Sequence, residues 1–180
     1  MVFLRSLDLF LTNGFNQIIP HNRFFDYFFS FFSLRGNSVF IWIVVVLFLI
    51  LFEEGKDHWF VVFFTLAFVT TALFVNFGLK NIARRTRPQG YIQKNLIDNA
   101  TCPKDFSFPS GHASTAFAAA AILSGFDKKR KYSYYLLALL IALSRVYLGC
   151  HFFLDISFGA MAGYLIGKSF YQLHRLIFHR

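Results

Sequence analysis

The sequence has little charge. Only 15% of its 180 residues are Asp, Glu, Lys or Arg. A soluble domain of this length needs more charge to cover its surface, so the composition argues against a water-soluble globular protein. The 2 cysteines, Cys102 and Cys150, are too few for a disulfide scaffold.

Apolar and aromatic residues take the place of the missing charge. They include 27 phenylalanines, and the mean hydropathy is +0.51. So many phenylalanines are hard to bury in one small aqueous core, which indicates a bilayer as the solvent. We therefore expect one all-α domain over residues 1–180, a multi-pass membrane bundle of five to six transmembrane helices.

The apolar runs predict five spans, at residues 38–52, 59–79, 109–126, 132–144 and 152–171. Residues 1–37 are the doubtful region. There Asp8, Asn13 and Asn16 interrupt an apolar pattern with helical spacing, which predicts either an amphipathic interfacial helix or a poor first span. The same polar residues make a poor secretory signal, so we expect this segment to be retained.

The net charge of +9 is concentrated in short breaks between the apolar runs. This placement favours membrane topology and an anionic ligand over nucleic acid. Residues 128–131 and the basic tail after residue 167 fall on one side of the predicted bundle, which the positive-inside rule makes cytoplasmic. Residues 80–109 and 145–151 then face the exterior or periplasm. The positive charges of residues 80–94 oppose this orientation if the charges of each loop are simply counted. We give them less weight because several of these residues are candidates for binding the anionic ligand.

The first cluster of candidate functional residues is basic. Lys80 and Arg87 are seven apart, two helical turns, so both can face one site, and Pro88 is expected to end the helix. The alternative is a cationic segment resting on anionic headgroups. Arg84, Arg85 and Lys94 follow the same pattern and are possible contacts to further headgroup charge.

The second cluster, Pro109-Ser110-Gly111-His112, precedes an alanine-rich helix. Proline just inside a helix start, free backbone N–H groups, the Ser110 hydroxyl and a glycine predict an anion cradle. His112, in the first turn, is placed to act as a general acid. The plain alternative is a helix cap.

The third cluster holds Arg145, His151 and Asp155. His151 and Asp155 are four apart and would share a helix face. The carboxylate would then fix the imidazole tautomer, leaving the other ring nitrogen as a nucleophile, while Arg145 presents its fork to a phosphate. Two membrane histidines can instead ligate haem or a metal. Because nearby Lys80, Arg87 and Arg145 would repel a cation, we expect neither metal nor cofactor.

Together the three clusters resemble, in order and spacing, the signature of the type 2 phosphatidic acid phosphatase (PAP2) family, over about residues 59–171. The resemblance implies a catalytic core there, with His151 as the nucleophile that forms a phosphohistidine, Asp155 orienting it and His112 protonating the leaving group. It also implies a phosphate held by the other motif residues, Lys80, Arg87, Ser110, Gly111 and Arg145.

A short membrane chain fits the lipid phosphatases of that family, without a metal, better than its soluble haloperoxidases. The expected activity is removal of a terminal phosphate, as a phosphomonoester or a pyrophosphate, from lipid A 1-phosphate, undecaprenyl diphosphate or phosphatidylglycerophosphate. The alternative is a transporter or flippase-like protein that binds lipid phosphate without cleaving it, although we find no internal repeat. The choice of lipid and the oligomeric state are left open.

Two further patterns have two interpretations each. Cys102 and Cys150 are predicted on the same side, but two unrelated small residues are the simpler interpretation. Gly159, Gly163 and Gly167 form a smooth helical stripe, which indicates either packing within the chain, the simpler case, or a dimer face.

Overall fold

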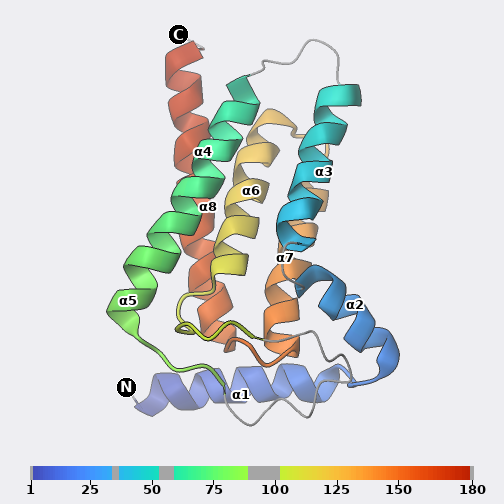
Figure 1. The fold of residues 1–180 in the computed structure, drawn as a ribbon, viewed down its shortest axis with the longest axis vertical. Coiled ribbons are helices and arrows are strands. Elements are labelled where there is room, and N and C mark those ends of the chain that lie inside the picture. Colours follow the sequence, from blue (N-terminus) through green and yellow to red (C-terminus); the bar gives the residue numbers. More distant parts are fainter. Residues whose placement is uncertain (1, 34–36, 53–58, 89–101, 179–180) are drawn as a thin grey trace.

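The computed structural model describes residues 2–33, 37–52, 59–88 and 102–178, and within these ranges the regular structure is entirely helical (Figure 1). This confirms the all-α prediction. The helices are α1 (Val2–Ile18), α2 (Arg23–Ser33), α3 (Asn37–Phe52), α4 (Trp59–Leu73), the π-helical turn η1 (Phe74–Leu79), α5 (Lys80–Ala83), α6 (Gly111–Phe126), α7 (Lys131–Tyr147) and α8 (Phe153–Phe178).

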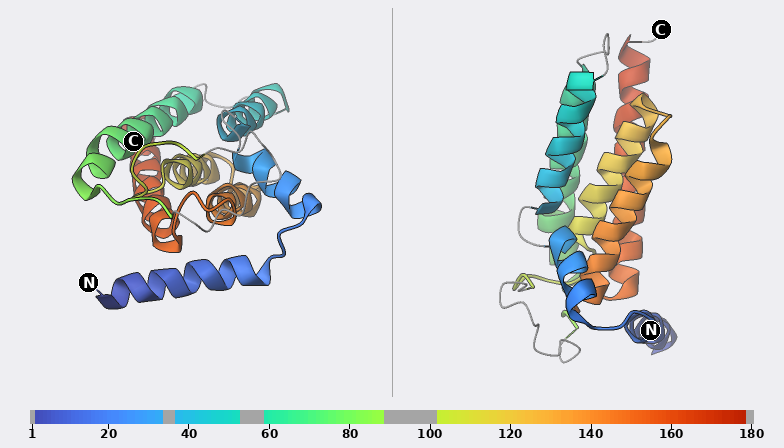
Figure 2. Two further views of the ribbon diagram at one scale, coloured as in Figure 1. Left: turned by 60° about the horizontal axis from the view of Figure 1, so that its bottom comes forward. Right: turned by 90° about the vertical axis from the view of Figure 1, so that its right-hand side faces the viewer.

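Helices α3, α4, α6, α7 and α8 run along the long axis of the bundle, and α6 lies at its centre (Figures 1 and 2). Nine of the 16 residues of α6 are buried, six of them alanines. Small side chains allow its neighbours to approach closely. On α8, a Cβ atom added at Gly163 would lie 1.9 Å from the Ser114 carbonyl oxygen, and one at Gly167 would lie 2.4 Å from that of Ala118. The glycine stripe therefore packs within the chain, the simpler of its two interpretations.

The outer faces of the long helices are apolar. On α3, Phe40, Ile43, Leu47 and Leu51 follow helical spacing and are 49–74% exposed, whereas Trp42 faces the core. Exposed apolar surface on this scale indicates contact with lipid. Among the described residues, Trp59–Ala83 is the one helix that is long and apolar enough to cross a membrane alone, with a mean hydropathy of 2.2, and α2 and α3 meet that standard only together.

Helix α1 lies across the bundle axis at one end (Figure 1). Its amphipathic pattern is the reverse of that of a soluble surface helix. Phe3, Phe10 and Ile18 are 74–81% exposed, while Asp8 and Thr12 are buried against the protein. This orientation fits the predicted interfacial helix, with its apolar face toward lipid.

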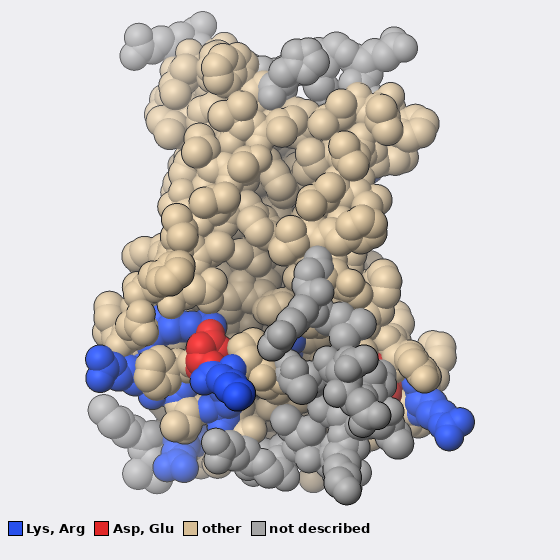
Figure 3. All heavy atoms as spheres, in the orientation of Figure 1, with Lys and Arg blue, Asp and Glu red and all other residues tan. Residues whose placement is uncertain are grey.

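The two ends of the bundle differ. On the face shown in Figure 3, the charged side chains gather at the end where α5 finishes and α6 begins. The turn between α7 and α8 is at this same end, whereas the α6–α7 turn and the C-terminus lie at the other (Figure 1). The three predicted clusters thus share one end. At the opposite end, Asp127 accepts hydrogen bonds from Arg130 and Tyr134, both at 2.6–2.7 Å.

Candidate active site

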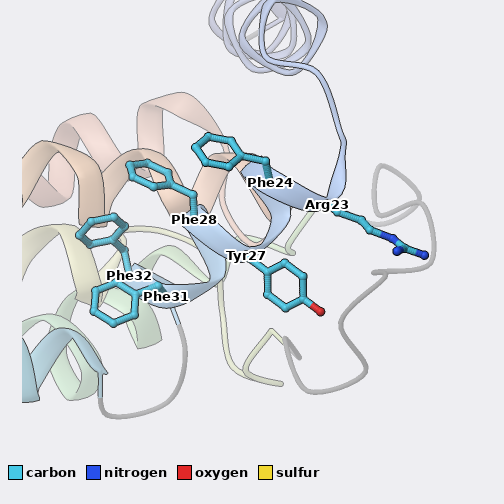
Figure 4. Close-up of a pocket in the computed structure, with 6 residues that line it drawn as sticks. All are labelled: Arg23, Phe24, Tyr27, Phe28, Phe31 and Phe32. Atoms are coloured by element: carbon cyan, nitrogen blue, oxygen red, sulfur yellow. The ribbon is translucent and has the colours of Figure 1, made fainter.

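One wide hollow in the surface is not the candidate site. It measures about 700 Å³ and is lined by one helix, α2, whose side chains there are mostly aromatic: Arg23, Phe24, Tyr27, Phe28, Phe31 and Phe32 (Figure 4). None of the described residues that line it is a histidine or carries a carboxylate. We interpret it as part of the apolar outer face of the bundle.

A second cavity, of about 340 Å³, brings the predicted clusters together. His112 and His151, which the sequence places in separate clusters, line it together with Lys80, Arg87 and Gly111. Its other lining residues are Ser38, Val39, Phe68, Ala72, Asn76, Pro103, Asp105 and Thr115. The cavity has a cationic, imidazole-bearing part and an apolar part, which suits a phosphate attached to a lipid.

Lys80 and Arg87 converge on one carboxylate, that of Asp105. Lys80 Nζ donates to one of its oxygens, and Arg87 Nη2 donates to the other at 2.5 Å. Arg87 Nε also donates to the Asp105 main-chain carbonyl at 2.9 Å. Burial alone would raise the pKa of Asp105, but the hydrogen bonds from Lys80 and Arg87 outweigh it and hold the pKa below its usual value. The two cations therefore already act as one anion site.

The route by which Arg87 reaches this site differs from the prediction. The helix ends at Arg84, which adopts a left-handed backbone with φ of 45°, and not at Pro88. Lys80 and Arg87 therefore do not share a helix face. Arg87 returns to the cavity along an irregular segment after α5, and there Arg85 accepts the backbone N–H of Ser107 at 2.7 Å.

His151 lies in the turn before α8, so its predicted position on the same helix face as Asp155 was wrong. Its Nε2 is 3.0 Å from Arg87 Nη1. Because a guanidinium can only donate, Nε2 must be the accepting nitrogen, which puts the proton of the neutral ring on Nδ1. Burial, followed by the charges of Arg145, Arg87 and Lys80, holds the pKa of His151 well below its usual range. The ring is therefore neutral, with its lone pair at the cavity.

Asp155 lies behind the imidazole. Its Oδ2 atom is 3.6 Å from His151 Nδ1, beyond a good hydrogen bond, and it accepts the backbone N–H of Phe152 at 2.9 Å and the hydroxyl of Ser107. The Phe152 bond is half of a capping box, because Phe152 precedes the first residue of α8 and Asp155 is its third. Arg85 Nη1 donates to Oδ1 at 2.7 Å. The carboxylate is thus held on three sides and faces Nδ1.

The start of α6 is built differently from the expectation. Ser110 is the helix cap, accepting the Ala113 N–H at 3.4 Å, so Pro109 lies before the helix and not inside it. The Ser110 N–H donates to the Asp155 main-chain carbonyl at 3.0 Å. The capping interpretation is therefore the one that the contacts support, and a role for the buried Ser110 hydroxyl in holding phosphate remains a prediction.

Gly111 has a close neighbour. A Cβ atom at this position would lie 2.8 Å from Oδ1 of Asn76, which itself lines the cavity from η1. Polar side chains in a membrane helix, and π-helical turns, both tend to mark functional sites. Asn76 could have been found from the sequence as a polar residue within the apolar run 59–79.

Arg145 is almost fully buried in α7. Its Nη1 donates to the hydroxyl and, at 3.2 Å, to the carbonyl of Ser33, while Nε and Nη2 have no partner among the described residues. A buried guanidinium with unmatched donors is costly unless an anion reaches it. The contacts agree with the predicted phosphate role without testing it.

The three suggested headgroup contacts have different environments. Arg85 is committed inside the protein, because it bridges the carboxylates of Asp8 and Asp155 and its guanidinium lies 4.0 Å from the Phe152 ring centroid. Arg84 is exposed and remains a candidate. Lys94 lies outside the described residues.

The geometry agrees with comparisons to known proteins. A sequence model described as the PAP2 superfamily matches residues 59–178. This chain belongs to the PAP2 superfamily. The lipid A 4′-phosphatase of Bacteroides thetaiotaomicron is 30% identical over 186 residues, covering 97% of this chain and 80% of that one. The undecaprenyl-diphosphatase of Sulfolobus acidocaldarius is 28% identical over 164 residues, covering 91% and 73%.

Two solved PAP2 structures share the fold. The phosphatidylglycerolphosphate phosphatase of Bacillus subtilis superposes with a TM-score of 0.77 at 24% identity, covering 98% of this chain and 89% of that one. Aquifex aeolicus LpxE superposes with a TM-score of 0.69 at 28% identity, covering 92% and 95%. These matches agree with the predicted polytopic membrane bundle.

Cys102 and Cys150 form a disulfide with a Cα–Cα distance of 5.3 Å. The simpler interpretation, that they are unrelated, was wrong. The bond ties the segment before the second PAP2 motif to the residue next to His151, across a separation of 48 residues. It therefore restrains the turn that carries the imidazole.

Several residues outside the PAP2 signature also belong to the site. Asp105 pairs with the two cations, Ser107 donates to Asp155, and Asn76 abuts Gly111. Within the described ranges, His, Cys, Asp and Glu side chains form no group of three suited to a metal ion. The cavity wall offers the cationic groups of Lys80 and Arg87 and the imidazoles of His112 and His151, whose chemistry suits an anionic ligand.

Proposed function

We propose that this membrane PAP2 phosphatase removes a terminal phosphate from a lipid headgroup through a phosphohistidine formed on His151. The observation that carries the proposal is the environment of His151. Its Nε2 lone pair faces a cavity in which Lys80 and Arg87 already converge on one anion and His112 forms part of the wall. Phosphoryl transfer needs mainly this combination of in-line positioning and fixed positive charge.

In the first step, the Nε2 lone pair of His151 attacks phosphorus and the bond from phosphorus to the lipid oxygen breaks. His112 donates a proton to that oxygen as it leaves. In the second step, His112 takes a proton from a water molecule, whose oxygen attacks phosphorus and breaks the P–N bond. Inorganic phosphate leaves and His151 returns to its neutral form.

Asp105 marks where the phosphate oxygens bind. A phosphate that takes its place would receive the same donors from Lys80 and Arg87, and would also draw Arg87 Nη1 away from His151 Nε2. Substrate binding would thus free the nucleophile at the moment it is needed. Arg145, with two unmatched donors, would add a third cation.

The lipid-linked phosphate class is supported by the cavity wall and by the relatives. Val39 of α3 and Phe68 of α4 line the cavity beside the cationic groups, so an apolar chain can follow the phosphate. The relatives are named for lipid A and for undecaprenyl diphosphate. We therefore propose a lipid A phosphate, undecaprenyl diphosphate or phosphatidylglycerophosphate, with exposed Arg84 as a candidate contact to a second headgroup charge.

We propose that the cavity opens on the extracytoplasmic side of the cell membrane. The disulfide beside His151 favours an oxidising compartment. The basic α6–α7 turn lies at the opposite end of the bundle, which agrees with the positive-inside rule.

The test is phosphate release by purified protein in detergent micelles from a panel of these three lipids, with and without EDTA. We expect release from at least one lipid, undiminished by EDTA. Strong inhibition by EDTA would contradict the metal-free mechanism. Binding of a phosphorylated lipid without any release would favour the transporter alternative.

A further inference from the structure

The sequence match to the PAP2 superfamily begins at residue 59, yet helix α1 reaches the catalytic carboxylate from outside that region. Asp8 of α1 is fully buried, with a relative exposure of 0%. A buried carboxylate on an interfacial helix is expensive unless it is fully paired. The groups that pair with the Asp8 carboxylate therefore indicate its role.

Both oxygens of Asp8 are used. Oδ2 accepts from Arg85 Nη2 at 2.6 Å, and Oδ1 accepts the backbone N–H of Leu154 at 2.8 Å. The other end of the Arg85 fork, Nη1, donates to Asp155 at 2.7 Å. Arg85 thus links the two carboxylates, and Asp8 also holds the first turn of α8, which carries Asp155.

Thr12, one turn further along α1, supports the same turn of α8 in a different way. Its hydroxyl oxygen accepts the Phe153 N–H at 3.0 Å. Within the part of the chain that the structure describes, Thr12 makes no hydrogen bond to Arg85 or to Asp155. Asp8 and Thr12 both accept hydrogen bonds from the first turn of α8. Only Asp8 also binds Arg85, the arginine that donates to Asp155.

We propose that Asp8 is a positioning residue of the active site: through Arg85 and the start of α8 it holds Asp155 toward His151. The inference rests on the proposed function of His151 and Asp155. It makes the interfacial helix part of the working enzyme. It also explains why α1 turns its polar residues inward and its apolar residues outward.

The experiment compares Asp8→Asn with Thr12→Val in the full-length protein, using the panel lipid that the wild type cleaves. Asparagine keeps the shape of the side chain but removes the charge that fixes Arg85. We expect kcat to fall about tenfold, because a small misplacement of a catalytic group is costly, with KM changed by less than about twofold, because Lys80 and Arg87 are untouched. Thr12→Val should lose no more than about twofold in kcat, even where both variants lower the melting temperature equally.

A double-mutant cycle with Arg85→Lys provides the second readout. If Asp8 acts through Arg85, Asp8→Asn should cost less than about twofold in kcat once Arg85 is replaced. Equal losses of kcat in Asp8→Asn and Thr12→Val, or additive losses in the cycle, would overturn the positioning role. Should Asp8→Asn fail to accumulate as folded protein, Arg85→Lys must by itself lower kcat at unchanged KM, and normal kcat there would overturn it too. A wild type that cleaves no lipid would instead reject the proposed function.

Discussion

His151 lies between two carboxylates that the protein treats differently. Asp155, behind the ring, has a side chain with 0% exposure, and Asp105, at the cavity, has one with 46% exposure. Each is paired with an arginine, Arg85 behind and Arg87 in front. The two ion pairs have similar N–O distances, 2.7 Å and 2.5 Å, but the exposure of their carboxylates differs.

Burial decides what each pair can do. Asp105 is half exposed beside its two nearly buried cations, so another anion can reach Lys80 and Arg87 and replace it at a lower cost than at a fully buried carboxylate. Removing one partner of a buried pair costs about 3–5 kcal/mol, so Asp155 stays where it is. The front pair is suited to substrate exchange and the rear pair to fixed orientation of the imidazole.

The largest effect on phosphate release is expected at His151, which lies next to both ion pairs. His151→Ala should lower phosphate release by at least about 1000-fold, because it removes the proposed nucleophile, and His112, the other imidazole at the cavity, is needed as the acid. Binding of the lipid should persist, since the front cations remain. Phosphate release and lipid binding measured on the same preparation check this. Full turnover in the variant would reject the nucleophile.

The three motifs could be predicted from the sequence because their residues are chemically demanding and closely spaced. The supporting contacts could not. Asp8 and Arg85 are 77 residues apart, and nothing local indicates that they pair. The helix end at Arg84 was missed because a left-handed turn usually calls for glycine or asparagine, whereas Pro88 is a strong local signal.

The next largest effect is a loss of stability, which should differ between variants of two neighbouring arginines. Arg85→Met should lower the free energy of unfolding by about 3–5 kcal/mol, because it leaves Asp8 and Asp155 buried without their cation. Arg84→Met, at an exposed position, should change it by less than about 0.5 kcal/mol. Denaturant unfolding in micelles measures both. Similar losses in the two variants would mean that the rear pair is not the buried structural element described above.

Loss of the disulfide, which restrains the turn that carries His151, should lower the stability of the protein by a smaller amount. Cys102→Ser should cost about 2–4 kcal/mol of stability under oxidising conditions and nothing further in a reductant. The double variant with Cys150→Ser is the control, and it should match the single variant. If the variant were still less stable than the wild type after the wild-type disulfide had been fully reduced, the loss would come from packing and not from the bond.

The smallest effect is expected at the front carboxylate. Asp105→Asn should improve inhibition by inorganic phosphate about two- to fivefold, because the exposed competitor for Lys80 and Arg87 loses its charge. Inhibition constants against a cleaved lipid measure this, with exposed Lys104→Gln as the control for general charge. Weaker inhibition by phosphate in Asp105→Asn would show that Asp105 orders the two cations and does not compete for them.

The most direct test of the account is to trap the covalent intermediate. Protein quenched during turnover of a lipid labelled in its terminal phosphate should carry one phosphoryl group, stable in alkali and labile in acid, on the peptide that contains His151. The label should be absent from His151→Ala. Turnover with no labelled protein, or label on any other residue, would contradict the central role given to His151.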